Sequence, residues 1–280
     1  MSTPAALTHE LFDDAALFPP AAVPLADALA AHRTRALGER AFLVGPLVLL
    51  ASQVPQVRAD FEPTDHFGLA VVADAGLAEL AAAVDVLADD PWADVDQVEI
   101  AVPAEFDLAE VTAALLDELP FTVPTYLELP WRAPPAALTD ALDVVAADGA
   151  ERVKLRTGGT KPGSVPSSSV LGEFLHGVAS RRVGFKLTAG LHRALPHVDP
   201  ATGDRQHGFL NTLAATAAAI DGGSTVDVVD LLDVSDAQPL IAVLRSSDLV
   251  ALRRIFRSIG SCSIAEPYDD LLALKLVEGD

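Results

Sequence analysis

The chain is poor in cysteine, in lysine and in positive charge, and each shortage excludes a class of function. Cys262 is the single cysteine among 280 residues, so no internal disulfide can form and a reducing compartment is expected. Lysine and arginine number 19 against 40 aspartates and glutamates, which gives a formal net charge of −21. Because nucleic acids and anionic membranes attract basic surfaces, neither is expected as a partner.

Long hydrophobic runs are also absent. No apolar run reaches the roughly 18 residues that a membrane span needs. The first ten residues lack the basic start and apolar core of a signal peptide, so a cytoplasmic location is expected. Hydrophobic residues still make up 50% of the chain, which is enough for one large core. The sequence leaves open whether the protein is a homo-oligomer.

Short apolar runs alternate eight times with amphipathic, alanine- and leucine-rich segments. This alternation is typical of parallel strands covered by helices, and eight units in about 250 residues predict a single (β/α)8 barrel domain over residues 1–280. The alternative is a doubly wound open sheet, but the G-x-G-x-x-G turn after its first strand is missing. The expected strands are 11–18, 42–50, 67–72, 98–102, 121–129, 153–156, 183–189 and 226–232. A last long helix is expected over 242–259, and residues 260–280 are expected to cap one mouth of the barrel.

Charged residues fall on the face of the strands that should point into the barrel. If the large apolar residues meet the helices, alternation turns five charges from four neighbouring strands inward. Barrel interiors are normally filled by layers of Val, Ile and Leu, so this cluster predicts an active site at the carboxyl ends of the strands. An ion network without chemistry is the alternative. The predicted catalytic residues are Lys186, Lys154, Glu128 and Glu99, and the fifth charge, Arg156, is predicted to bind an anion.

Lys186 stands in the middle of the apolar run Val183–Ala189, where an unpaired lysine would be costly. Neighbouring Lys154 and Arg156 would lower its pKa and make it a nucleophile able to form a Schiff base, whereas the two lumen glutamates would raise that pKa. The sequence does not decide between them. A lysine paired with a carboxylate in the core is the structural alternative.

Three of the four lysines fall between residues 154 and 186, which concentrates positive charge in an acidic chain. A glycine- and hydroxyl-rich loop follows the sixth expected strand and ends at a helix start near residues 167–169. Backbone N–H groups and the helix N-terminus favour an anion there. We therefore expect a small anionic metabolite as the ligand. The other substrate-binding candidates are Thr157, Gly158, Gly159, Thr188, His192, Asn211 and Asp14.

Asp13 and Asp14 occupy the first expected strand, so one of them must face the lumen as a general base or ligand. Both faces of this expected strand carry apolar residues, so alternation does not decide whether Asp13 or Asp14 faces the lumen. A nucleophilic Cys262 would need a histidine partner, and no such partner is evident in the sequence.

Three sequence blocks resemble a family of bacterial (β/α)8-barrel proteins to which no reaction is firmly assigned. They are residues 154–159 (KLRTGG), 185–192 (FKLTAGLH) with 207–211 (HGFLN), and 260–271 (GSCSIAEPYDDL). Similar sequences carry two histidines where this chain has His192 and Arg193, and this difference argues against a metal. His192, His197 and His207 could ligate one, but their spacing fits no zinc signature, so neither a metal nor another cofactor is expected.

More loosely, residues 185–190 are similar to the Lys-Thr-Ser-Thr-Gly strand of deoxyribose-phosphate-type class I aldolases, in which the lysine forms a Schiff base. The resemblance implies that Lys186 is the nucleophile and that Lys154 lowers its pKa. Those aldolases carry the nucleophile on the sixth strand, whereas the expected strands put Lys186 on the seventh.

Together these features predict a cytosolic barrel enzyme that acts on a small anionic carbonyl compound by lyase, aldolase-like or isomerase chemistry. One alternative is a non-catalytic barrel that binds a metabolite or a partner protein. The other is a metal-dependent hydrolase that uses Asp13 or Asp14 together with His192.

Overall fold

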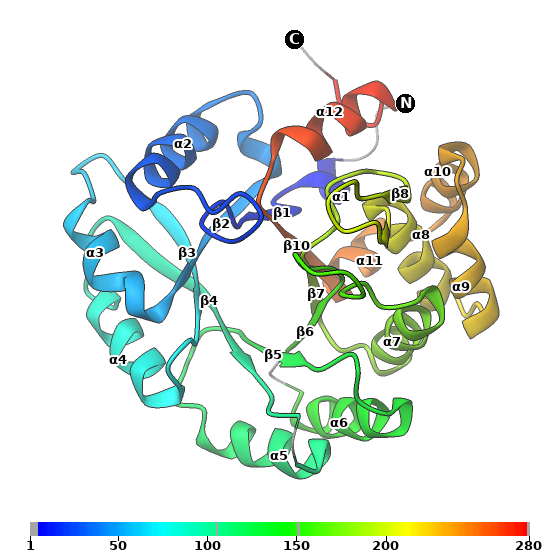
Figure 1. The fold of residues 1–280 in the computed structure, drawn as a ribbon, viewed down its shortest axis with the longest axis horizontal. Coiled ribbons are helices and arrows are strands. Elements are labelled where there is room, and N and C mark those ends of the chain that lie inside the picture. Colours follow the sequence, from blue (N-terminus) through cyan, green and yellow to red (C-terminus); the bar gives the residue numbers. More distant parts are fainter. Residues whose placement is uncertain (1–4, 105, 150–151, 279–280) are drawn as a thin grey trace.

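The computed structural model describes residues 5–104, 106–149 and 152–278. Eight parallel strands close into a barrel in the order β1-β10-β7-β6-β5-β4-β3-β2, and helices surround it (Figure 1). The closed parallel barrel confirms the predicted (β/α)8 fold and excludes the open sheet. No helix within the described ranges combines the length and apolar character needed to cross a membrane.

Seven of the eight barrel strands lie close to the positions that the apolar runs predict. The barrel strands are β1 (Phe12–Asp14), β2 (Val44–Leu50), β3 (Phe67–Val72), β4 (Ala93–Ala101), β5 (Thr125–Leu129), β6 (Arg152–Arg156), β7 (Phe185–Thr188) and β10 (Phe256–Ser261). Two further short strands, β8 (His197–Val198) and β9 (Arg205–Gln206), pair with each other in the connection after β7.

Helices follow the strands and cover the outside of the barrel (Figure 1). They are α1 (Ala5–Thr8), α2 (Leu25–Leu37), α3 (Val54–Ala59), α4 (Leu77–Leu87), α5 (Leu108–Glu118), α6 (Pro135–Asp148), α7 (Ser168–Arg181), α8 (Phe209–Ile220), α9 (Thr225–Asp233), α10 (Ala237–Ser246), α11 (Leu249–Ile255) and α12 (Ala265–Ala273), with 3-10 turns η1 (Ala41–Leu43) and η2 (Ala51–Gln53).

The prediction of the eighth strand was wrong. Residues 226–232 form most of α9, because Ser224 and Asp227 make a capping box and the apolar residues Val228 and Leu232 are buried at the i, i+4 spacing of a helix. The true eighth strand, β10, lies at the end of the segment that was expected to be helical. Residues 260 and 261 therefore belong to the barrel wall, and only the chain beyond them lies outside it.

The outer face of the strands is apolar, as alternation predicts. Phe185 and Leu187 of β7 are fully buried, and the Phe185 ring packs edge-on against Phe174 of α7 and Phe256 of β10, at 5.7 and 4.9 Å between ring centroids. The alternate side chains of β7, Lys186 and Thr188, therefore face the lumen. In-register pairing sets Lys154 of β6 beside the β7 lysine, so that charged side chains become neighbours.

The reassigned strand makes a prediction about stability. Ile259→Ala in β10 should destabilise the protein by about 2–5 kcal/mol, because Ile259 is fully buried and its truncation leaves a cavity. Val226→Ala is the matched control: Val226 is 67% exposed in α9, so its truncation should change the unfolding free energy by about 0.5 kcal/mol or less. Urea titrations of both variants measure this, and comparable losses would contradict the assignment.

Candidate active site

The carboxyl ends of the strands open into a cavity of about 770 Å³. Its walls come from the barrel strands, from the loop at residues 15–21, from the connection that carries β8 and β9, and from the start of α12. This is the end of a (β/α)8 barrel at which active sites lie. The predicted residues that line it are Glu99, Glu128, Lys154, Arg156, Gly159, Lys186, Thr188 and His192.

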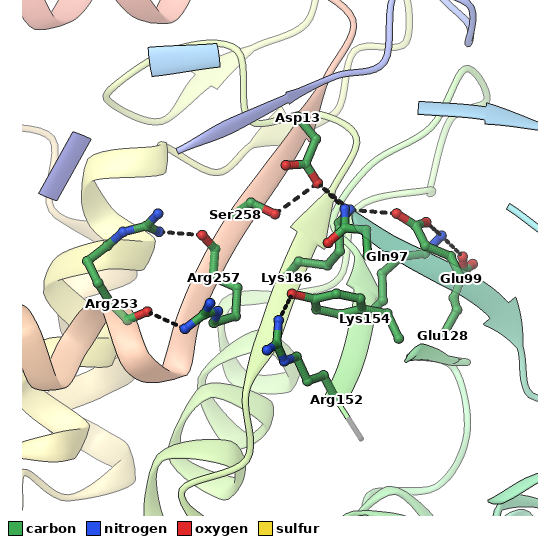
Figure 2. A network of polar contacts seen from close by, with 11 residues as sticks. Asp13, Gln97, Glu99, Glu128, Arg152, Lys154, Lys186, Arg253, Arg257 and Ser258 are labelled. Atoms are coloured by element: carbon green, nitrogen blue, oxygen red, sulfur yellow. Dashed lines mark hydrogen bonds and ion pairs between the residues drawn. The ribbon is translucent and has the colours of Figure 1, made fainter. Parts of the chain in front are cut away.

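At the base of this cavity two lysines share one carboxylate (Figure 2). Lys154 Nζ lies 2.5 Å from Glu99 Oε2, and Lys186 Nζ lies 2.5 Å from Glu99 Oε1. Lys154 also contacts Glu128 Oε2 at 2.6 Å, and Lys186 contacts the Asp13 carboxylate. The five side chains thus form a chain of alternating charge, Asp13–Lys186–Glu99–Lys154–Glu128, which we call the ion chain. Strand alternation predicted that its two lysines and two glutamates would meet; their catalytic roles stay predictions.

Asp13, not Asp14, is the aspartate of β1 that faces the lumen. Its Oδ2 accepts hydrogen bonds from Gln97 Nε2 and from Ser258 Oγ, both at 2.9 Å. Gly45 leaves the room for it, since a Cβ at that position would lie 2.7 Å from Asp13 Oδ1. Sequence reasoning missed Gln97 and Ser258. Gln97 could have been predicted, because it lies two residues before Glu99 and therefore on the same face of β4. Ser258 could not, because the sequence analysis expected its segment to be helical.

The ion chain fixes the charge state of its central members. Burial lowers the pKa of Lys186, but the carboxylates of Asp13 and Glu99 outweigh this effect and raise the pKa above that of a free lysine. Burial likewise raises the pKa of Glu99, and the two lysines overcome it and lower the pKa to about 2. Lys186 is therefore a protonated cation at neutral pH. The sequence had left open whether its pKa is raised or lowered.

The two lysines differ in their access to the cavity. The Lys186 side chain is 0% exposed and lies over the face of the Tyr126 ring, 5.3 Å from its centroid. The Lys154 side chain is 5% exposed, and its partner Glu128 is 21% exposed. Both lysines line the cavity, but Lys154 and Glu128 are the more accessible end of the ion chain, and Lys186 is its fully buried part.

A second layer of polar groups lies one step further along the same strands. Arg156 follows Lys154 by two residues on β6, and Thr188 follows Lys186 by two residues on β7; the two are register partners. Arg156 is exposed at the cavity, and no ion pair joins it to another described residue. Thr188 Oγ1 is buried without a hydrogen-bond partner among the described residues. These groups are placed to meet a ligand above the ion chain.

The loop after β6 is held by its own backbone. Thr157 is buried, and its Oγ1 donates to the carbonyl oxygen of Ala189 at 2.6 Å. Gly158 lies against Gly190, where an added Cβ would come within 3.0 Å of the Gly190 Cα. Of the predicted loop residues, only Gly159 lines the cavity. Thr157 and Gly158 therefore position the loop, and their contact with substrate stays a prediction.

Asp14 and Asn211 do not line the cavity, and their role in substrate binding stays a prediction. Asp14 points toward α2, where it accepts hydrogen bonds from His32 Nδ1 at 2.8 Å and from Arg35 Nε at 3.1 Å. Burial raises the Asp14 pKa, but these two partners prevail and lower it. Asn211 Nδ2 donates to the carbonyl oxygens of Leu231 and Val234, both at 2.8 Å, and so links α8 to the end of α9.

The three histidines do not converge. His192 and His197 line the cavity, whereas His207 is buried and donates from Nε2 to the carbonyl oxygen of Pro166 at 2.8 Å. Across the described part of the chain, no three His, Cys, Asp or Glu side chains are arranged to hold a metal ion.

Cys262 has the histidine partner that the sequence did not reveal. Its Sγ lies 3.7 Å from His192 Nε2, and His192 Nδ1 lies 3.2 Å from Glu266 Oε2. The pair forms because β7 and β10 are neighbours, so the segments that follow them meet at the same mouth. With the eighth strand expected at 226–232, Cys262 had no reason to lie beside His192.

The ion chain predicts a loss of stability in acid. The folded-state pKa of Glu99 lies near 2, below its ordinary value of 4.5, so its stabilisation is present above pH 4.5 and is lost as the pH falls toward 2. The loss should be on the order of 3 kcal/mol for a shift of this size. Urea unfolding measured across this pH window should show a shallower slope in Glu99→Gln than in the wild type. An unchanged slope would show that Glu99 is not the ionised centre of the ion chain.

Comparison with known proteins does not supply a family. A scan against protein-family models gives no match, and a search of curated proteins finds none that is significantly similar. The functional argument therefore rests on the geometry of the cavity and on the motifs in the sequence.

Proposed function

We propose that the protein is a cytosolic barrel enzyme in which Lys154 forms a Schiff base with a small anionic carbonyl compound and supports aldolase-like cleavage or isomerisation. The observation that carries this proposal is that two lysines share the Glu99 carboxylate, and that Lys154 and its partner Glu128 keep some exposed surface whereas Lys186 is fully buried. A lysine in a partly desolvated site beside another cation is a recognised arrangement for an amine nucleophile.

Lys186 is not suited to the nucleophilic role that the sequence assigned to it. Asp13 and Glu99 raise its pKa, so its amine carries a proton and has no free electron pair for attack. Its fixed charge instead compensates Glu99, which leaves Glu128 as the carboxylate that Lys154 does not share with another lysine. Glu128 is the more exposed of the two glutamates and can take the proton that Lys154 must lose.

The reaction then uses groups already in contact. Lys154 transfers a proton to Glu128, and its neutral Nζ attacks the carbonyl carbon, while a proton moves from the nitrogen to the carbonyl oxygen to give a carbinolamine. Protonated Glu128 then returns its proton to the carbinolamine hydroxyl, which leaves as water as the iminium forms. The iminium accepts the electron pair released by cleavage of a carbon–carbon bond or by loss of a neighbouring proton. Glu128, 2.6 Å from Nζ, is placed to return a proton in the reverse half of the cycle.

The resemblance to class I aldolases supports the same choice. In those enzymes the nucleophile is on the sixth strand, and the sixth strand of this barrel, β6, carries Lys154, followed by Leu155, Arg156 and Thr157. The role that the resemblance assigns to a lysine therefore moves from Lys186 to Lys154. The resemblance to the bacterial barrel family with the three sequence blocks adds no reaction, since none is assigned to it.

An anionic substrate follows from where the positive charge lies. The chain has a net charge of −21, yet Lys154, Arg156 and Lys186 line one cavity. The lysines are compensated by the ion chain, whereas Arg156 is not paired with a described carboxylate. Arg156 is therefore the group that would bind a phosphate or carboxylate, with the adjacent backbone of Gly159 and Thr160 as further donors.

Trapping with borohydride tests the nucleophile. Wild-type protein incubated with pyruvate, dihydroxyacetone phosphate or glyceraldehyde 3-phosphate and then reduced should gain the substrate mass on the peptide that contains Lys154. Lys154→Arg keeps the ion pairs but should give no adduct, because its guanidinium is not nucleophilic. Lys161→Arg, at an exposed loop lysine, should react like the wild type. An adduct on Lys186 would contradict the assignment, and ligand binding without any adduct would favour the non-catalytic barrel.

Substitution of Arg156 tests the anion site. Arg156→Ala should weaken binding of inorganic phosphate and of anionic substrates by about tenfold or more, since a charge-assisted hydrogen bond contributes about 1.5–3 kcal/mol. Because Arg156 is exposed, the unfolding free energy should change by about 0.5 kcal/mol or less. Arg254→Ala, at an exposed position of α11, is the control in the same calorimetric titration. Equal affinities in both variants would place the anion elsewhere.

A further inference from the structure

Three side chains on the rim of the cavity connect a thiol to a carboxylate. Cys262 Sγ lies 3.7 Å from His192 Nε2, and His192 Nδ1 lies 3.2 Å from Glu266 Oε2, with Ser261 Oγ a further 3.4 Å neighbour of Nδ1. Cys262, His192 and Glu266 all line the same cavity as Lys154. A nucleophile, a base and a group that orients the base are the parts that thiol catalysis requires.

Each member comes from a different element that is fixed in place. Cys262 follows β10, His192 follows β7, and Glu266 lies in the first turn of α12. The helix is tied to the segment after β7, since Asp270 accepts two hydrogen bonds from Arg193, at 2.8 and 2.9 Å, and one from the Ala194 N–H at 2.7 Å. The helix that carries Glu266 is thereby held beside the segment that carries His192.

The protonation states of His192 and Cys262 are those needed for a histidine that takes a proton from a thiol. Burial lowers the pKa of His192 more than Glu266 raises it, with His197 and Asp199 as the other charged neighbours. Burial also raises the pKa of the Cys262 thiol, helped by the charges of Glu266 and Asp14. Both groups are therefore neutral. Nδ1–H then donates to Glu266, and Nε2 presents its lone pair to the thiol.

A separate observation is that two polar atoms of cavity-lining residues have no hydrogen-bond partner among the described residues. Gln206 lines it and is only 4% exposed, yet its Oε1 has no hydrogen-bond partner among the described residues. His197, another lining residue, likewise has an unpartnered Nδ1. Buried polar atoms are normally satisfied, so these atoms await donors from a ligand. A small hydroxylated compound would supply them.

We propose that Cys262, His192 and Glu266 form a second reactive site, in which the thiol adds reversibly to a small hydroxylated aldehyde. The Cys262 sulfur forms a bond to the carbonyl carbon, while the π electrons of the C=O bond move to oxygen. His192 Nε2 accepts the thiol proton and delivers it to that oxygen. The product is a thiohemiacetal, so the step needs neither oxidant nor leaving group. It does not depend on Lys154, and it can hold an aldehyde that enters or leaves the cavity.

The experiment benefits from the single cysteine, because any thiol reagent reports on Cys262 alone. Carbon-13-labelled glycolaldehyde added to wild-type protein should give a thiohemiacetal signal by NMR that is absent in Cys262→Ser. Glycolaldehyde should also protect the thiol from iodoacetamide in a saturable manner, whereas ethylene glycol, which has no carbonyl group, should not. The signal should persist in Lys154→Arg, which separates this proposal from the Schiff-base reaction.

The role of the histidine has its own measurement. His192→Asn should slow alkylation of Cys262 by about tenfold or more, within the range for loss of a general base. Glu266→Gln should slow it less, and because Glu266 is half exposed this variant keeps its fold. Circular dichroism confirms folding of each variant. Equal alkylation rates in all three proteins, or a thiohemiacetal signal that survives in Cys262→Ser, would overturn the proposal.

Discussion

The centre of this structure is a carboxylate shared by two lysines. Glu99 is buried, and an isolated charge in that position would be strongly unfavourable. Lys154 and Lys186 each place Nζ 2.5 Å from one of its oxygens, and Asp13 and Glu128 complete the alternation of charge at either end. Removing one member of such a buried pair costs about 3–5 kcal/mol, because the partner is left unpaired. The ion chain therefore constrains the fold as well as the chemistry.

The shared carboxylate also separates the two lysines by function. Each lysine contacts two carboxylates, but Lys186 is fully buried, and Asp13 and Glu99 raise its pKa so that it stays protonated. Lys154 reaches the cavity and shares Glu128, a carboxylate that solvent and substrate can approach. In the proposed mechanism, Lys186 supplies electrostatic support and Lys154 reacts. This division follows from depth in the barrel, since both residues are lysines on neighbouring strands in the same register.

The rim of the cavity differs from its base. The base is ionic, largely buried and held by strands, whereas the rim is formed by the segments after β7 and β10 and by the start of α12. The Arg193–Asp270 pair joins two of these segments and holds the rim together. A ligand would therefore meet neutral thiol and imidazole groups at the rim and charged amines below them. Carbonyl compounds are the chemical class common to the two proposals, because both a thiol and an amine can add to a carbonyl carbon.

The sequence by itself determined the barrel, seven of its eight strands and the inward parity of Glu99, Glu128, Lys154 and Lys186, because apolar periodicity and alternation are local properties of the chain. It could not locate β10, since a short apolar strand directly after a helix has no local signal that separates it from that helix. Tertiary structure alone decided three further matters. These are the direction of the Lys186 pKa, which depends on distances across the lumen, the choice of Asp13 over Asp14, and the pairing of Cys262 with His192. All three depend on which strands are neighbours and on how deeply a side chain is buried. Neither of these properties is encoded within a single segment of the sequence.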